Sequence, residues 1–243
     1  MRVLIFSKRC AKEILRDPIN LAFGLGFPII LLFLLTLMQK NIPANLYKIE
    51  TLTPAITVFG FSFITLFSAT LVAKDRESSF LNRLYTTPLK SIDFIVGYML
   101  PFVPIAMAQS VICYAVAAIL GLTISVNVLY ALLTLLPISV FYISLGLLCG
   151  SIFNVKQVGA LCGALLTNIS AWLSGIWFDI SLLGDTFETI SNFLPFLHAV
   201  ELEKAIINSD FREVFSHLTV VILYSVLTTV FSVLLFLRQM NKQ

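Results

Sequence analysis

Six long apolar stretches without a charged side chain constrain this 243-residue chain more than any other feature of its sequence. None contains Lys, Arg, Asp, Glu or His. A helix of roughly 20 apolar residues crosses the hydrocarbon core of a bilayer, which is about 30 Å thick. The stretches are Ile19–Met38, Pro54–Ala73, Phe94–Leu120, Val126–Cys149, Gln157–Phe178 and Leu218–Leu237. They predict an all-α integral membrane protein with six transmembrane helices in a single domain, residues 1–243.

The overall composition supports the same class. Hydrophobic residues make up 58% of the chain and charged residues 12%, against roughly 45–50% and about 25% in ordinary globular domains. So little polar surface cannot cover a globule in water, which excludes a cytosolic enzyme and a disordered regulator. The net charge of +3 is too small and too scattered for a nucleic-acid binder.

Basic residues predict the orientation. If the N-terminus is cytoplasmic, twelve of the sixteen Lys and Arg residues fall on the cytoplasmic side, and four (Lys40, Lys48, Lys204 and Arg212) fall outside. Cytoplasmic loops carry an excess of Lys and Arg. We therefore expect a multi-pass protein of the plasma (inner) membrane with both termini in the cytoplasm.

The N-terminal segment, residues 1–17, has the pattern of an interfacial helix. Val3, Phe6, Cys10 and Ile14 recur at spacings of three and four, and basic residues lie off that stripe. Such a basic amphipathic helix is expected to lie in the cytoplasmic headgroup layer. The alternative is an unstructured basic leader.

Residues 74–91 form the loop between the second and third predicted spans. Phe80, Leu81, Leu84 and Tyr85 recur at helical spacing among polar neighbours. A short helix with an apolar and a charged face is a typical docking element for a cytoplasmic partner. A plain turn between helices is the alternative, although it needs only a few residues.

Residues 179–217 are too polar to span a membrane and too apolar to be a free loop. Two amphipathic runs meet at Pro195, which predicts a pair of short re-entrant helices on the outer side. The acidic residues of this segment are interpreted as a solvated outer rim: Asp179, Asp185, Glu188, Glu201, Glu203, Asp210 and Glu213.

Small residues four apart allow close helix packing. Gly146 and Gly150 end the fourth span, while Gly159 and Gly163 begin the fifth. Because only a short loop separates these spans, a tight hairpin between them is expected, with a dimer seam as the alternative.

The predicted spans contain none of the side chains that would couple transport to an ion gradient or catalyse a reaction. Gln109, Asn168 and other neutral side chains are the polar groups in the spans, whereas ion-coupled transporters place ionisable groups near the midplane. There is no phosphate-binding G-x-x-x-x-G-K-[ST] sequence and no histidine in a span that could activate a serine. If the chain moves a substrate, the energy must come from another protein.

The sequence resembles the permease subunits of ABC-2 type exporters, especially the drug- and antibiotic-exporter branch. The similarity extends over the whole chain, and Ser78-Ser79 departs from a glycine common in the family. The matching residues are Leu15-Arg16-Asp17-Pro18, Phe27-Pro28-Ile29, Asp75-Arg76-Glu77, Phe80-Leu81-x-Arg83-Leu84-x-x-Thr87-Pro88-Leu89, Gly97-Tyr98 and Leu194-Pro195.

The resemblance implies a permease that pairs with a second copy or a paralogue and takes energy from a separate ABC ATPase. The coupling helix at this ATPase would comprise Asp75, Arg76, Glu77, Phe80, Leu81, Arg83 and Leu84. Asn168 and Trp172 would face the substrate path along the dimer interface. This chain would bind no cofactor, since ATP and magnesium belong to the partner. The expected substrate is a small amphipathic or hydrophobic compound such as a drug, antibiotic or peptide.

Two other functions stay open. An intramembrane lipid-modifying enzyme would need an ionisable cluster near one interface, and the outer acidic residues lack a matching His or Lys array. A non-transporting membrane assembly subunit would have the same sequence features as a permease, so only substrate flux distinguishes the two.

Overall fold

The computed structural model describes residues 2–40, 48–78, 91–177 and 180–240, and every regular element in these ranges is a helix. The predicted all-α class is therefore confirmed. The elements are α1 (Arg2–Leu15), α2 (Pro18–Gln39), α3 (Ile49–Glu77), α5 (Ser91–Leu120), α6 (Val126–Ile152), α7 (Val155–Val158), the π-helical η1 (Gly159–Leu166), α8 (Thr167–Leu173), the 3-10 helix η2 (Ile180–Leu183), α9 (Asp185–Phe193), α10 (Pro195–Ile207) and α11 (Phe211–Met240).

Five of the described helices are long and apolar enough to cross a membrane: α2, α3, α5, α6 and α11. They coincide with five of the six predicted stretches. The remaining stretch, Gln157–Phe178, is divided among α7, η1 and α8, which follow one another with lengths of 4, 8 and 7 residues. None of these three is long enough alone.

Helix α3 is the centre of the bundle. In its apolar 18-residue stretch 83% of the residues are buried, against 22% in α2 and in α11. Buried small and hydroxyl side chains on α3, among them Thr57, Ser62, Thr65 and Ser68, let other helices come close. The Thr65 hydroxyl donates to the carbonyl oxygen of Tyr142 on α6 at 2.8 Å. The peripheral helices present their apolar side chains outward, as lipid-facing helices do.

The glycines of α6 pack against α3, not against the following helical segment. A Cβ atom on Gly146 would lie 2.4 Å from the carbonyl oxygen of Thr65, and one on Gly150 would lie 2.4 Å from that of Ala69. Around Gly159, by contrast, nothing lies within 4 Å of such an atom. The expected tight hairpin between the two glycine pairs is therefore wrong. The backbone of α6 approaches that of α3, which is distant in the sequence, and not that of the helical segment that follows α6.

Helix α2 begins where the sequence predicts a helix to start, and helix α3 begins earlier than predicted. Asp17 caps α2, accepting a hydrogen bond from the Asn20 amide at 3.3 Å, with Pro18 at the first helical position. The second predicted stretch begins at Pro54, but α3 begins earlier, at Ile49. Burial of Leu52 in the core favours the extra helical turn before the proline.

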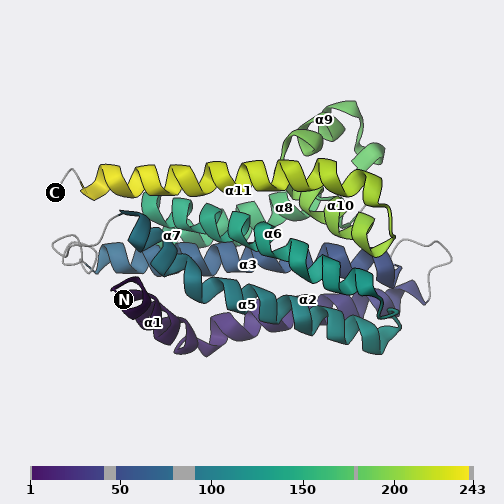
Figure 1. Cartoon of the computed structure of the whole chain (residues 1–243), viewed down its shortest axis with the longest axis horizontal. Coiled ribbons are helices and arrows are strands. Elements are labelled where there is room, and N and C mark those ends of the chain that lie inside the picture. Colours follow the sequence, from purple (N-terminus) through teal and green to yellow (C-terminus); the bar gives the residue numbers. More distant parts are fainter. Residues whose placement is uncertain (1, 41–47, 79–90, 178–179, 241–243) are drawn as a thin grey trace.

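The helices lie along one long axis, and the two ends of the bundle differ (Figure 1). Helix α1 and the last turns of α11 lie at one end, called here the α1 end. Helices α9 and α10 lie toward the opposite end, called the α9–α10 end. The stripe on α1 that includes Phe6, Cys10 and Ile14 is buried against the bundle.

Candidate coupling site

The candidate site is built around the last turn of α3 at the α1 end. Asp75, Arg76 and Glu77 were expected to belong to a separate coupling helix, but they continue α3. The helix ends at Ser78, whose amide donates to the carbonyl oxygens of Lys74 and Arg76. Three consecutive side chains of one helical turn point in different directions, about 100° apart, so each can contact a different element.

Asp75 is buried, with 2% of its surface exposed, and connects α3 to α1 and α5. The Arg9 guanidinium donates to both carboxylate oxygens, with Nη2 2.7 Å from Oδ1 and Nη1 in close contact with Oδ2. The Tyr98 hydroxyl donates to Oδ2 at 2.8 Å. A two-pronged guanidinium–carboxylate pair is the strongest and most directional ion pair that proteins use. It fixes α1 to the end of α3.

Aromatic packing holds α1 in the same position. The Phe6 ring meets Tyr98 edge-on at 4.8 Å between centroids and Phe94 at 5.8 Å. Gly97 lies under this ring, since a Cβ there would come within 2.4 Å of Phe6 Cδ1. The glycine thus leaves the room that Phe6 occupies. Burial also raises the pKa of the Cys10 thiol to about 12, so it stays neutral and acts as a packing residue.

Arg76 and Glu77 contact the junction between α6 and α7. Arg76 donates to two carbonyl oxygens at the end of α6, that of Phe153 at 2.7 Å and that of Ser151 in close contact. Glu77 Oε1 accepts from the Val155 amide at the start of α7 at 2.9 Å. A cation at a helix C-terminus and an anion at a helix N-terminus both complement the helix dipole. Arg76 thus binds the partly negative C-terminal end of α6, and Glu77 binds the partly positive N-terminal end of α7. Together they hold the α6–α7 junction against the end of α3.

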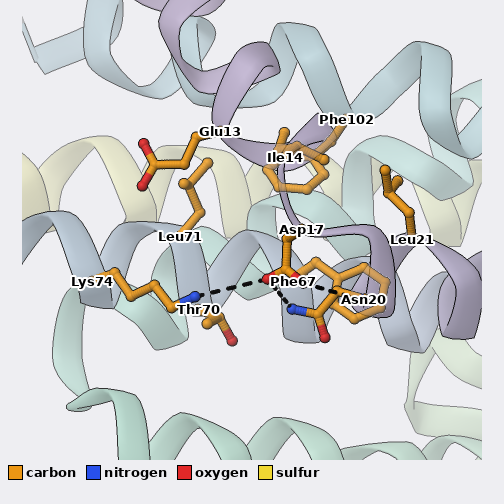
Figure 2. A pocket seen from close by; sticks show the side chains of 10 residues that line it. All are labelled: Glu13, Ile14, Asp17, Asn20, Leu21, Phe67, Thr70, Leu71, Lys74 and Phe102. Atoms are coloured by element: carbon orange, nitrogen blue, oxygen red, sulfur yellow. Dashed lines mark hydrogen bonds and ion pairs between the residues drawn. The ribbon is translucent and has the colours of Figure 1, made fainter.

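Figure 2 shows the turn between α1 and α2, which lies against the same stretch of α3. Asp17, besides capping α2, lies 3.8 Å from Lys74 Nζ in a half-exposed ion pair. A small pocket opens here between Glu13 and Leu21 on one side and Phe67 on the other. Its cavity volume of about 40 Å³ admits water molecules and no transported substrate.

The other predicted site residues divide into two groups. Phe80, Leu81, Arg83 and Leu84 lie outside the described residues, and their contact with an ATPase stays a prediction. Asn168 and Trp172 both lie on the exposed side of α8. The Asn168 amide donates to the Ala164 carbonyl at 2.7 Å. The structure does not bring this pair together with Asp75, Arg76 and Glu77, which lie at the α1 end.

Sequence reasoning missed two kinds of functional residue. Arg9 looked like one of several surface cations, because its partner Asp75 is 66 positions away. Glu203 was assigned to a solvated rim, which is wrong: it is fully buried in α10. Helical spacing places it on one face with Ala199 and Ile206, both buried. That spacing was the signal that could have revealed it.

The fold and this site describe a multi-pass membrane protein with a polar, ordered cluster at one end. Residues 1–208 match the ABC-2 type transporter family, and the chain belongs to that family.

Two curated relatives are similar over most of the chain. The capsule polysaccharide export inner-membrane protein CtrC of Neisseria meningitidis serogroup B is 27% identical over 181 residues, 73% of this chain and 68% of that protein. The protein of the same name from serogroup A is 25% identical over 215 residues, 83% of this chain and 80% of that protein. Neither name supports the drug- or antibiotic-exporter branch that the sequence resemblance favoured.

Proposed function

We propose that this chain is the permease subunit of an ATP-driven exporter, which forms a translocation path as a dimer and hydrolyses no ATP itself. The energy would come from a separate ABC ATPase bound near the loop between α3 and α5. Membership of the ABC-2 family supports a transport component. The observation that carries the coupling role is the set of bonds from one turn of α3 to α1, α5 and the α6–α7 junction.

A topology in which the chain crosses the membrane six times fits the sequence and the fold best. The segments α7, η1 and α8 follow one another without a break from Val155 to Leu173, close to the roughly 20 residues that a helix needs to cross the hydrocarbon core. Counted as a crossing, this run places α1 and the end of α11 on the same side, which is the cytoplasmic side by the distribution of Lys and Arg. Helix α1 would then lie in the cytoplasmic headgroup layer of the inner membrane, and α9 with α10 would form the outer re-entrant pair.

The bonds of Asp75, Arg76 and Glu77 refine their role in coupling. Since all three contact other parts of this chain, they would carry movement of the loop into the bundle. Contact with the ATPase would fall to Phe80, Leu81, Arg83 and Leu84. Movement of that loop would shift α1 and the α6–α7 junction together, because rigid, bonded elements move as units.

The favoured substrate class is a polysaccharide. Its support is the export of capsule polysaccharide named for both relatives. A small amphipathic compound, the class expected from the sequence, has no comparable support. Asn168 and Trp172, exposed on α8, would face a second permease copy and the path between them. A Trp face beside an amide is suited to sugar rings, which offer an apolar face and hydroxyl groups.

The decisive experiment is co-purification from native membranes with a C-terminal tag. We expect a stoichiometric soluble ATPase with the wild-type chain, and its loss with Phe80→Asp combined with Leu84→Asp, because both changes place charge on the apolar stripe. Asn82→Asp with Thr86→Asp adds the same charge to the same loop off that stripe and should keep the ATPase.

Retention of the ATPase by the double Asp variant of Phe80 and Leu84 would overturn the docking role of the stripe. Absence of any ATPase with the wild-type chain would favour an assembly subunit or a lipid-modifying enzyme. Export of a labelled glycan by the reconstituted complex, compared with export of a hydrophobic dye, would then decide the substrate class.

A further inference from the structure

The α9–α10 end contains a buried carboxyl group that the coupling role does not use. Glu203 lies near the end of α10 and has no exposed surface. Its neighbours on the helix, Leu202 and Ile206, are buried apolar residues. A carboxylate in such surroundings is unstable unless a cation or several hydrogen-bond donors compensate it.

The contacts of Glu203 come from two neighbouring helices. The Thr134 hydroxyl on α6 lies 2.6 Å from Oε1, and the Tyr114 hydroxyl on α5 lies 3.4 Å from Oε2. Both partners are uncharged. Among the residues that the structure describes, no Lys, Arg or His forms an ion pair with this carboxyl.

The hydrogen bonds at this site can accommodate the neutral acid. Thr134 Oγ1 also lies 3.0 Å from the Ala131 carbonyl oxygen, yet a hydroxyl has only one hydrogen to donate. With Glu203 ionised, Thr134 donates to the carboxylate, and the Ala131 carbonyl keeps only its helical bond within α6. With Glu203 protonated on Oε1, the acid donates to Thr134, and Thr134 donates to Ala131. All three groups are then satisfied.

The charged groups described on the surrounding elements form no ion pair with Glu203. On α10 itself, Glu201 pairs with Lys204 at 2.9 Å. The two histidines, His198 of α10 and His217 of α11, bond to each other at 2.8 Å between their Nδ1 atoms. Apart from Tyr114, no other titratable residue on the elements packed against α10 forms a described bond with Glu203. These residues include Glu50 on α3, Cys113 on α5, Tyr130 and Tyr142 on α6, Asp185 and Glu188 on α9, and Arg212, Glu213 and Tyr224 on α11, and Tyr142 bonds instead to Ser170 at 2.9 Å.

We infer that Glu203 is a proton-binding latch: its protonated carboxyl holds α10 against α5 and α6, and loss of the proton releases α10 toward water. This role is independent of the proposed transport function, since it follows from the packing of α10 alone. The ligand of the site is a proton, and the movable element is α10 with the preceding α9.

Thermodynamic linkage sets the size of the expected effect. Burial raises the pKa of Glu203 from its ordinary value near 4.5 to about 8. An exposed carboxyl loses its proton readily at pH 6, whereas the buried one keeps it. The ratio of released to docked α10 should therefore rise roughly a hundredfold between pH 6 and pH 9. Replacing the carboxyl by an amide removes this dependence.

Infrared spectroscopy of the purified full-length chain in lipid nanodiscs tests the protonation state directly. The probe is the C=O stretching band of a protonated carboxyl, followed from pH 5 to pH 10. We expect a band that disappears with a midpoint near pH 8 in the wild type and is missing in Glu203→Gln. The matched control is Glu201→Gln, which changes the same group on the same helix and should keep the band.

A second variant keeps the test decisive if Glu203→Gln does not accumulate. Thr134→Val removes the closer of the two hydroxyl partners that can stabilise the carboxylate, so the band should persist to higher pH. A wild-type spectrum at pH 6 without a band attributable to Glu203 would overturn the protonated state.

Hydrogen exchange of the backbone amides in α10 tests the release. After correction for intrinsic exchange rates, α10 in the wild type should exchange tens of times faster, relative to α3, at pH 9 than at pH 6. In Glu203→Gln the ratio should not change with pH. An equal increase in both proteins would show that α10 is not held by this carboxyl.

Discussion

Asp75 and Glu203 are two buried carboxyl groups at opposite ends of the same bundle, and their partners differ in kind. Asp75 receives both prongs of the Arg9 guanidinium and the Tyr98 hydroxyl. Glu203 has two hydroxyl groups and no cation among its described partners. The first arrangement stabilises a carboxylate, and the second suits a neutral acid.

This difference follows from where each group lies along the bundle. Arg9 reaches Asp75 from α1, a helix rich in basic residues at the α1 end, so a compensating charge is available there. Glu203 lies in α10 against α3, α5 and α6, and no basic side chain in the described ranges forms an ion pair with it. Burial alone does not determine the charge of an acid, because its partners decide it.

The largest expected effect comes from removing the cation at the α1 end. Arg9→Ala leaves Asp75 buried without a compensating charge, which typically costs about 3–5 kcal/mol. The apparent melting temperature in detergent should fall steeply, and Asp75→Asn in the same background should recover part of the loss. Lys8→Ala removes an exposed neighbouring cation and should change stability by less than about 0.5 kcal/mol. Equal losses in Arg9→Ala and Lys8→Ala would mean that the ion pair contributes nothing.

A medium effect is expected at Glu203 and depends on pH. Because the folded chain keeps this proton up to about pH 8 and the unfolded chain loses it near 4.5, the contribution of Glu203 to stability should be fully present below pH 4.5 and fall as pH rises through 8. Between pH 6 and pH 8 the loss should be about 2 kcal/mol. Thermal unfolding of the wild type and of Glu203→Gln over this range measures it. The amide variant should have the smaller slope, and identical slopes would assign the pH dependence to other groups.

Much of the fold could be predicted from the sequence, because a membrane helix satisfies its own backbone and is recognised by local apolar length. The five helices that are long and apolar enough to cross a membrane are of this kind. The run from Val155 to Leu173 was harder, since its π-helical part interrupts the regular pattern. The start of α3 was misplaced for another reason. Burial of Leu52 against distant helices extends α3 before Pro54, and no local signal reports that burial.

Less of the candidate site could be predicted. The string Asp75-Arg76-Glu77 was recognised by resemblance, but its partners Arg9, Phe153 and Val155 come from far apart in the sequence. Contacts of this kind depend on which helices are neighbours, which periodicity does not give. Glu203 is different, because its spacing from apolar residues was visible. It was misjudged because acidic residues outside the spans were all treated as solvated.

The two tyrosines compare the ends most directly, and Tyr114→Phe should have the smallest effect of the predicted changes. Tyr98→Phe removes a 2.8 Å hydrogen bond to the Asp75 carboxylate, and Tyr114→Phe removes a 3.4 Å bond to Glu203. A hydrogen bond to a charged group contributes about 1.5–3 kcal/mol, while a long bond between neutral groups contributes about 0.5 kcal/mol or less. Denaturation of both variants at pH 6 gives the two values. If Glu203 were ionised at that pH, Tyr114→Phe would be as harmful as Tyr98→Phe, and the two ends would not differ.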